Sequence, residues 1–340
     1  MLAAAFAFGL ACCSLPAQTY NPEAVAEAQR GVGFSQQAQY RDAIKAYQRA
    51  IGLDPRLPGI YLNLGLAWFK MGVFKEAAAA FEKQNQIASS DQNSTLLAMS
   101  YFGLARYKEA SARLKPLADA QPQNGELSYL LAKCYFWSGQ TDEAMNIFRQ
   151  LLERDPDSAP VHMLLGEAYD ARYMPDDAIK EFEAAAQAGP TQPDVHFGLG
   201  YLYWKQKRFD DAERQFREEL KNDAKHPQAE AYMGDVMMKL GRKREATELL
   251  KHAEQLQNDL HIVHEDLGVL YADDKRSVLA MAEFREAIRT DPGNFDAHYR
   301  LARLYRELGR KEEADREFAI VQKLHEKKTE EPLMNISGPR

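Results

Sequence analysis

The sequence predicts an all-α protein built from tandem repeats, each of which folds into two antiparallel helices. Three observations support this prediction: alanines recur at a fixed interval, small and aromatic residues follow in phase at helical spacings, and Gly or Pro lies between the expected helices. A fixed period of about 20–50 residues is typical of solenoids and other repeat architectures. The 340-residue chain is therefore expected to form one solenoid domain, with its apolar residues distributed over a string of interfaces.

A regularly spaced series of alanines, which we call a ladder, defines the repeat. Nine alanines are spaced by 34 residues, with one step of 33: Ala43, Ala77, Ala110, Ala144, Ala178, Ala212, Ala246, Ala280 and Ala314. At roughly one chance in ten per position for a common residue, so regular a ladder does not arise by accident. The shorter step places a one-residue deletion after Ile87, in a connecting turn where a change in length is tolerated.

Two further ladders explain how the helices of a repeat pack. Twelve residues before each alanine the slot holds only Gly or Ala: Gly31, Gly65, Ala98, Ala132, Gly166, Gly200, Gly234, Gly268 and Ala302. Four residues after each alanine the slot is large and apolar: Tyr47, Phe81, Leu114, Phe148, Phe182, Phe216, Leu250, Phe284 and Phe318. Helical spacing places these residues on one face of each helix, where small residues let the two helices approach and large ones fill the space between them.

Helix breakers lie where two helices per repeat require them. The residues Gly72, Gly139, Gly241 and Gly309 fall between a first and a second helix, where a left-handed backbone is easiest for glycine. The prolines Pro55, Pro122, Pro156, Pro190 and Pro292 close five of the repeats. Pro116 falls inside a second helix, which we expect it to kink or shorten.

This pattern resembles that of the tetratricopeptide repeat proteins. The clearest instance consists of Tyr61, Leu64, Gly65, Trp68, Gly72, Phe74, Ala77 and Phe81. The resemblance implies an all-α, right-handed superhelical solenoid of antiparallel helix pairs. It covers nine repeats, at residues 24–57, 58–90, 91–124, 125–158, 159–192, 193–226, 227–260, 261–294 and 295–328. The solenoid is thus expected over residues 24–328, followed by a flexible tail at 329–340.

The first seventeen residues do not follow the repeat. Leu2 to Leu15 is an uncharged apolar run, too short to span a bilayer, and is followed by Pro16-Ala17-Gln18. We interpret residues 1–17 as a signal peptide, so the protein is expected to be exported and periplasmic or secreted. The alternative is a membrane-anchored lipoprotein with a lipid anchor at Cys12 or Cys13. A retained hydrophobic terminus is a third interpretation.

Composition and motifs argue against several function classes. A formal net charge of −7 disfavours nucleic-acid binding, which needs a basic face. The phosphate-binding, metalloprotease and nucleophile-elbow motifs of common enzymes do not occur. Beyond the first seventeen residues Cys134 is the one cysteine, and it is expected to be a buried apolar residue. We therefore predict no catalytic residue and no cofactor.

Four histidines occupy the same repeat slot, namely His162, His196, His264 and His298. Neighbouring helices pack about 8–10 Å apart, whereas each histidine ligand of a zinc ion must come within about 2.1 Å of it. The histidines are therefore expected to replace a structural aromatic residue, and no metal site is predicted. Asn93-Ser94-Thr95 and Asn335-Ile336-Ser337 match the glycosylation acceptor pattern.

The resemblance implies that the first helices of successive repeats line a concave groove. The candidate groove residues are Leu62, Leu66, Phe69, Met99, Phe102, Tyr129, Lys133, Phe136, Trp137, Met163, Phe197, Tyr201, Trp204, Arg303 and Arg306. From the second to the sixth repeat this lining is apolar and aromatic, and it then becomes charged. The expected partner is a protein or peptide with large apolar side chains. The competing interpretation is that solenoid curvature or the chain's own tail buries some of these aromatic residues.

The function predicted from these residues is that of a non-catalytic scaffold for protein–protein interaction, acting in bacterial cell-envelope assembly or secretion. The alternative is an accessory or substrate-presenting subunit of an envelope glycosyltransferase or protease carried on another chain. Self-association through the open ends of the solenoid is a third hypothesis.

Overall fold

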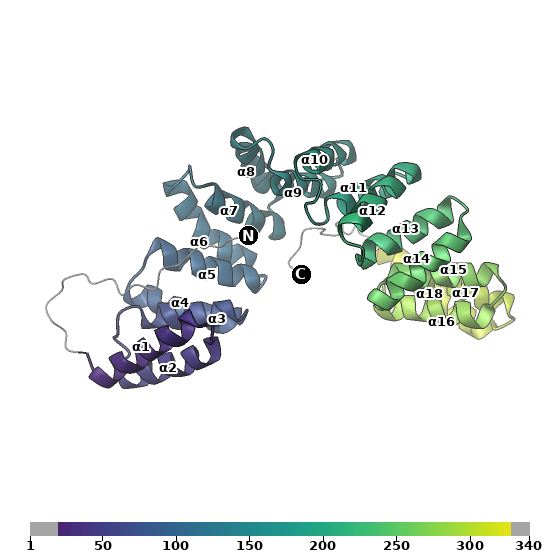
Figure 1. The fold of residues 1–340 in the computed structure, drawn as a ribbon. Coiled ribbons are helices and arrows are strands. Elements are labelled where there is room, and N and C mark those ends of the chain that lie inside the picture. Colours follow the sequence, from purple (N-terminus) through teal and green to yellow (C-terminus); the bar gives the residue numbers. More distant parts are fainter. Residues whose placement is uncertain (1–19, 328–340) are drawn as a thin grey trace. The chain divides into compact units, whose positions relative to one another are not determined.

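A computed structural model describes residues 20–327 of the chain. These residues form eighteen α-helices and contain no strand. The chain divides into two compact units, the first ending at Leu151 and the second beginning at Leu152. Figure 1 shows the first unit in purple to blue and the second in teal to yellow.

The first unit is a run of helix pairs. Its helices are α1 (Pro22–Gln36), α2 (Tyr40–Leu53), α3 (Ile60–Lys70), α4 (Phe74–Ile87), α5 (Asp91–Gly103), α6 (Tyr107–Ala120), α7 (Gly125–Trp137) and α8 (Thr141–Arg154), whose last residues pass the boundary between the units. From α1 to α7 each helix packs against the next one in the chain.

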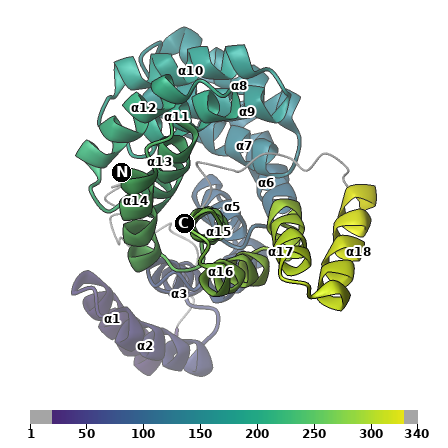
Figure 2. The same ribbon diagram turned by 90° about the vertical axis from the view of Figure 1, so that its right-hand side faces the viewer.

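The second unit repeats this arrangement. Its helices are α9 (Ala159–Ala171), α10 (Pro175–Ala188), α11 (Val195–Lys205), α12 (Phe209–Asn222), α13 (Pro227–Lys239), α14 (Lys243–Leu256), α15 (His261–Asp273), α16 (Ser277–Thr290), α17 (Phe295–Glu307) and α18 (Lys311–Lys327). Each of these helices packs against the next one, and first helices also touch one another, as α11 with α13 and α15 with α17. Figure 2 shows the final pair, α17 and α18, lying side by side.

The small and large residues of the ladders meet as the sequence predicts. A Cβ atom added to Gly200 would lie 2.7 Å from the ring of Phe216, and one added to Gly65 would lie 2.5 Å from the ring of Phe81. Both rings are fully buried between the two helices of their pair. A larger residue in the small slot would force the helices apart. The Gly or Ala positions therefore mark where the two helix axes approach closely.

The turn between the first and second helix has a left-handed residue in all nine repeats. These residues are Ala38, Gly72, Ala105, Gly139, Tyr173, Lys207, Gly241, Lys275 and Gly309. The prediction for the four turn glycines is confirmed, and five residues that are not glycine adopt the same conformation. In the Gly72 turn, the N–H of Gly72 donates to the carbonyl of Phe69 and the N–H of Val73 donates to that of Trp68. These bonds satisfy the last carbonyls of the first helix.

The predicted all-α solenoid of tandem antiparallel helix pairs is confirmed. Of the two effects expected of Pro116, shortening of its helix is wrong, since α6 and α4 each have fourteen residues, and a kink stays a prediction. The predicted signal peptide, the lipid anchor at Cys12 or Cys13, and the tail at 329–340 lie outside the described residues. Within residues 20–327, none of the helices has the length and hydropathy needed to cross a membrane.

Candidate binding surface

The fifteen candidate groove residues lie on the first helices of both units, and their exposure divides them into three groups. Leu66, Phe136, Met163, Phe197 and Tyr201 are buried. Leu62, Phe69, Met99, Phe102, Tyr129, Lys133, Trp137 and Trp204 are half-buried. Arg303 and Arg306 are exposed. Only the second and third groups offer side-chain surface to a partner.

The buried aromatic residues belong to the contacts between repeats. Phe197 is 2% exposed, and its ring centre lies 4.9 Å from that of His226 and 5.9 Å from that of Tyr232, both on the following helix pair or the loop before it. Tyr201 meets the same Tyr232 edge to face at 5.2 Å. These two residues were predicted to line the groove, but the first helix of the following repeat covers them.

The first unit carries a half-buried aromatic surface built from Phe69, Phe102, Tyr129, Lys133 and Trp137, on the first helices α3, α5 and α7. We call it the unit 1 aromatic surface. The ammonium group of Lys133 lies 5.2 Å from the ring centre of Phe102 and 5.6 Å from that of Tyr129, within reach of cation–π attraction. Lys133 thereby links the side chains of two neighbouring repeats.

Second-helix aromatic residues support this surface. The ring of Phe69 meets that of Phe74 edge to face at 5.5 Å, and the ring of Phe102 meets that of Tyr107 in the same way at 5.2 Å. Trp137 lies 6.3 Å from the ring centre of the same Tyr107 and packs against Phe136 of its own helix, with ring centres 5.1 Å apart. Such contacts fix the ring orientations in the free protein, which lowers the entropy lost on binding.

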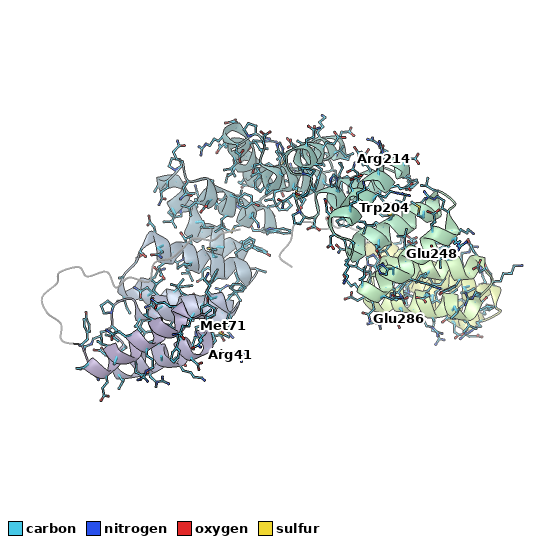
Figure 3. The ribbon with its side chains drawn as sticks, in the orientation of Figure 1. Arg41, Met71, Trp204, Arg214, Glu248 and Glu286 are labelled. Atoms are coloured by element: carbon cyan, nitrogen blue, oxygen red, sulfur yellow. The ribbon has the colours of Figure 1, made fainter. Side chains whose placement is uncertain are left out.

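In the second unit the candidate residues are tied into a polar network. The indole N–H of Trp204, labelled in Figure 3, donates to Oδ2 of Asp235 at 2.6 Å. The ammonium group of Lys205 lies 2.6 Å from Oδ1 of Asp170. Burial raises the pKa of the Asp170 carboxyl, and burial together with Asp170 raises the pKa of Tyr201 to about 12. The first helices α9, α11 and α13 therefore share buried acidic groups.

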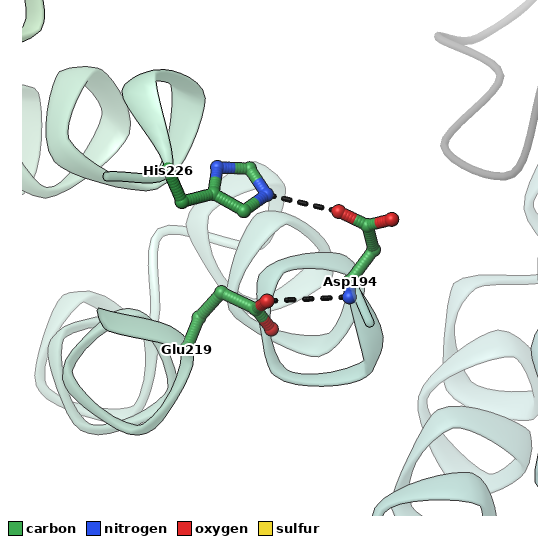
Figure 4. A group of neighbouring side chains, drawn as sticks. All are labelled: Asp194, Glu219 and His226. Carbon is green, nitrogen blue, oxygen red and sulfur yellow. Dashed lines mark hydrogen bonds and ion pairs between the residues drawn. The ribbon is translucent and has the colours of Figure 1, made fainter. Parts of the chain in front are cut away.

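Asp194, Glu219 and His226 converge from three elements, as Figure 4 shows. Glu219, on α12, accepts the backbone N–H groups of Asp194 at 3.2 Å and Phe197 at 3.0 Å and so caps the start of α11. His226 is the N-cap of α13, where its Nδ1 accepts the N–H of Ala229 at 3.1 Å. Its Nε2 lies 2.9 Å from Oδ1 of Asp194.

The position of the ring proton decides whether this group suits a metal ion. Because Nδ1 of His226 accepts an N–H, the proton of the neutral ring lies on Nε2 and is donated to Asp194. A metal ion on Nε2 would move that proton to Nδ1. The Nδ1–H group would then face the N–H of Ala229, and two donors cannot hydrogen-bond each other. The three residues therefore fit a role in capping two helices and do not fit a metal site.

A second group of potential ligands, Glu254, His264 and Glu283, fails the same test. Nε2 of His264 lies 2.9 Å from the carbonyl oxygen of Asn258, and a carbonyl can only accept. Nδ1 lies 2.9 Å from a carboxylate oxygen of Glu283, and this hydrogen bond raises the pKa of His264. Both ring nitrogens are thus donors, so neither presents a lone pair to a cation.

The His264 arrangement recurs, and we call it the histidine clamp: one ring nitrogen bonds a second-helix glutamate and the other bonds a carbonyl in the preceding loop. His162 bonds Glu181 at 2.6 Å and the carbonyl of Pro156 at 2.8 Å. His298 bonds Glu317 at 2.6 Å and the carbonyl of Pro292 at 3.3 Å. The slot in which histidine was expected to replace a structural aromatic residue therefore makes polar links, one to the second helix of its own repeat and one to the end of the preceding repeat.

Two other residues that the sequence singled out are buried. The Cys134 thiol is inaccessible, and burial raises its pKa to about 12, so it is not a nucleophile. The side chain of Asn93 donates to the carbonyl of Phe81 at 2.8 Å and to Asn85 at 2.7 Å. Asn93 is fully buried, so the folded protein does not present its glycosylation motif.

Sequence reasoning did not single out the buried carboxyl groups on the first helices of the second unit, among them Asp266. Asp266, on α15, is 6% exposed, and its Oδ2 has no hydrogen-bond partner among the described residues. The signal available in the sequence was the run His264-Glu265-Asp266, three polar residues between Val263 and the apolar residues Leu267 to Leu270. A buried carboxyl group is unusual enough to need an explanation.

Tandem helix pairs whose first helices present part of their side chains to solvent define a helical-repeat solenoid. A family model described as "Cilia and flagella-associated protein 70 C-terminal domain", whose short name marks it as a tetratricopeptide repeat model, matches residues 115–335, more than half of the chain. A model described as "TPR repeat" matches residues 34–72. The chain belongs to the tetratricopeptide repeat family.

Solved structures of the same fold agree with this assignment. The chain is similar to pilF of Pseudomonas aeruginosa, with a TM-score of 0.54 and 20% identity, covering 61% of this chain and 94% of that one. It is also similar to a monomeric IFIT1 mutant solved with Gppp-AAAA, with a TM-score of 0.51 and 17% identity, covering 90% of this chain and 82% of that one. Identities this low show the fold alone. None of the curated protein sequences compared with the chain matches it.

Proposed function

We propose that the chain is a non-catalytic scaffold that binds a partner protein or peptide through the first helices of its repeats. The observation that carries this proposal is the unit 1 aromatic surface, where rings from three successive first helices lie half-buried and held in place by neighbouring rings. Pre-oriented aromatic side chains are favoured anchors at protein interfaces. The chemistry of the surface favours a partner with large apolar side chains.

The non-catalytic part of the proposal rests on how the reactive groups are used. Cys134 is buried with a raised pKa. The ring nitrogens of His264 are both occupied in a clamp, and those of His226 cap a helix and bond Asp194. These groups stabilise the structure of their repeats. An enzyme role is accordingly proposed only in the alternative form, as an accessory or substrate-presenting subunit of an envelope glycosyltransferase or protease.

The cellular setting rests on the sequence. The apolar segment at residues 1–17 supports export, and with it a role in bacterial cell-envelope assembly or secretion. The net charge of −7 supports a protein partner and argues against nucleic acid. Self-association, in which the open end of one solenoid packs against another copy of the chain, is a further hypothesis.

Selection from a display library of random peptides tests the proposal. The full chain should enrich peptides with two or more large apolar residues, and Phe102→Ala combined with Trp137→Ala should abolish that enrichment. Tyr173→Ala is the matched control, because it removes an aromatic ring that is 60% exposed in a turn of the second unit. If the double variant enriches the same peptides as the unmodified chain, the unit 1 aromatic surface is not the binding site.

A further inference from the structure

The second unit contains a buried carboxyl group that its own fold does not satisfy. Oδ2 of Asp266 is shielded from solvent and has no partner among the described residues. Burial and the nearby Asp235 carboxylate raise the pKa of Asp266 well above its usual range. Leaving such a group unpaired destabilises a folded protein, so its presence calls for a partner from outside the fold.

Charged groups on three first helices act electrostatically on Asp266. Asp235 and Lys239 come from α13, Glu265 from α15 and Arg300 from α17. Asp235 is engaged on both oxygens, by the indole of Trp204 at 2.6 Å and by Lys239 at 3.2 Å.

Glu265 is only partly satisfied. It accepts a hydrogen bond from Asn294 at 3.1 Å and lies 3.5 Å from Nε of Arg300, which itself has no hydrogen-bond partner among the described residues. Burial raises the pKa of Glu265, and Asp296 and His261 also face it.

The charge balance of this cluster leaves room for one cation. With all groups ionised, the three carboxylates of Asp235, Glu265 and Asp266 exceed the two cations Lys239 and Arg300 by one negative charge. When Asp266 is protonated these five groups are neutral, and the Asp296 carboxylate that faces Glu265 adds a further negative charge. An added cation would let Asp266 ionise and would supply the missing hydrogen-bond donor to Oδ2.

Aromatic rings border the same carboxyl groups. Trp204 and Tyr232 meet edge to face with ring centres 5.0 Å apart, and Trp204 bonds Asp235 directly. Burial raises the pKa of Tyr232, and the negative charges of Asp235 and Asp266 add to that effect. Carboxylates next to aromatic rings form an environment suited to ammonium and guanidinium groups.

The spacing of the carboxyl groups disfavours a bare metal ion. Asp235, Glu265 and Asp266 do not each bring an oxygen within 4.8 Å of the others, unlike the two clusters already described. Oxygen ligands must lie about 2.0–2.6 Å from a Mg²⁺ or Ca²⁺ ion, which requires close convergence. A guanidinium or ammonium group on a long side chain carries several donors and can bond carboxylates that are farther apart.

We propose that Asp235, Glu265 and Asp266 form a subsite on the first helices of the second unit that binds the cationic end of a Lys or Arg side chain of a partner protein or peptide. This inference rests on the proposed function and deepens it, because it assigns the partner a basic residue in addition to large apolar ones. Asp266 provides the free acceptor, Asp235 and Glu265 provide the surrounding negative charge, and Trp204 provides the flanking ring.

The test is the same peptide selection carried out with Asp266→Asn. The unmodified chain should enrich peptides that contain Lys or Arg, and Asp266→Asn should reduce that enrichment at least tenfold while leaving the enrichment of apolar peptides intact. Glu248→Gln is the control, because it removes the same charge from an exposed side chain on α14, labelled in Figure 3. Calorimetry of the best selected Lys- or Arg-containing peptide over a range of pH should show proton release with the unmodified chain that is lost in Asp266→Asn.

The outcomes separate the two proposals. Apolar enrichment without a basic residue, or a basic preference that survives Asp266→Asn, overturns this inference and leaves the scaffold function standing. A failure to enrich any peptide refutes the scaffold function itself. Asp266-dependent binding of Ca²⁺, Mg²⁺ or Zn²⁺ alone would identify an ion site and overturn the inference. Thermal unfolding checks that Asp266→Asn folds. The selection is also carried out with Glu265→Gln, which removes the charge of a less buried carboxyl group in the same subsite.

Discussion

Replacing Glu283 by Gln should weaken the repeat formed by α15 and α16 and change its pH dependence. Glu283 raises the pKa of His264, which is nearly buried. A histidine whose pKa is raised on folding contributes stability that is fully present below its unfolded pKa of about 6.5. That contribution is lost as the pH rises through the folded pKa.

The magnitude follows from the bond that changes. The glutamine amide in Glu283→Gln would keep an acceptor oxygen for Nδ1 of His264 but would remove the negative charge. Hydrogen bonds to charged groups contribute about 1.5–3 kcal/mol and neutral ones about 1 kcal/mol, so Glu283→Gln should cost about 1–2 kcal/mol near pH 6. Above the folded pKa the difference should shrink or reverse, since the Gln amide can donate to the neutral ring.

Hydrogen exchange is the suitable assay because repeat proteins lose stability locally and need not unfold in one step. Amide protection in α15 and α16, corrected for the intrinsic exchange rate, should fall roughly 5- to 30-fold in the variant at about pH 6. The reasoning is refuted if the loss is absent at about pH 6, or if it is the same at about pH 9.

The chain supplies a reciprocal experiment. His196 occupies the same slot as His264, but its Nδ1 meets the neutral Gln215 at 2.8 Å. Gln215→Glu should create the charged hydrogen bond that Glu283 makes to His264 and stabilise α11 and α12 below about pH 6.5. Exchange in α15 and α16 serves as the internal control and should not change.

Three further predictions concern packing and reactivity. In α1, Gly31→Ala should destabilise by about 1–3 kcal/mol because its Cβ would lie 2.5 Å from the Tyr47 ring, whereas Gly33→Ala has open space and should stabilise by about 0.5–1 kcal/mol in urea unfolding. Phe216→Ala should cost about 3–5 kcal/mol by emptying a fully buried site, and exchange protection in α11 and α12 would show it. Iodoacetamide should label Cys134 in urea but not in the native protein at about pH 8, and rapid native labelling would contradict its burial.

The ladders predict the fold because they record contacts within one repeat. Gly200 meets Phe216 inside a single helix pair, so a period of 34 residues with helical spacing is enough to place both. The turns follow for the same reason, since each joins two helices of one pair. What the period does not encode is the contact between a side chain and a particular neighbouring repeat.

The candidate surface shows this limit. Phe197 and Tyr201 occupy groove slots, yet Tyr232 of the next repeat covers both, and a different residue at position 232 would leave more of them exposed. Asp266 escapes sequence reasoning for a different reason. A carboxylate on an amphipathic helix is normally solvated, so the sequence does not predict that this one is buried. Its burial depends on α13 and α17, which the repeat pattern places nearby without fixing their side chains.

The left-handed turns carry a consequence for how the sequence can change over evolution. Ala38, Ala105, Tyr173, Lys207 and Lys275 hold a backbone conformation that disfavours any residue with a Cβ, by about 1 kcal/mol each. A single change to Gly at any of these positions would relieve that strain without altering a packed surface, as the four turn glycines already do. The array therefore has five sites that can compensate for destabilising substitutions elsewhere, which leaves its exposed first-helix residues freer to vary as partners change.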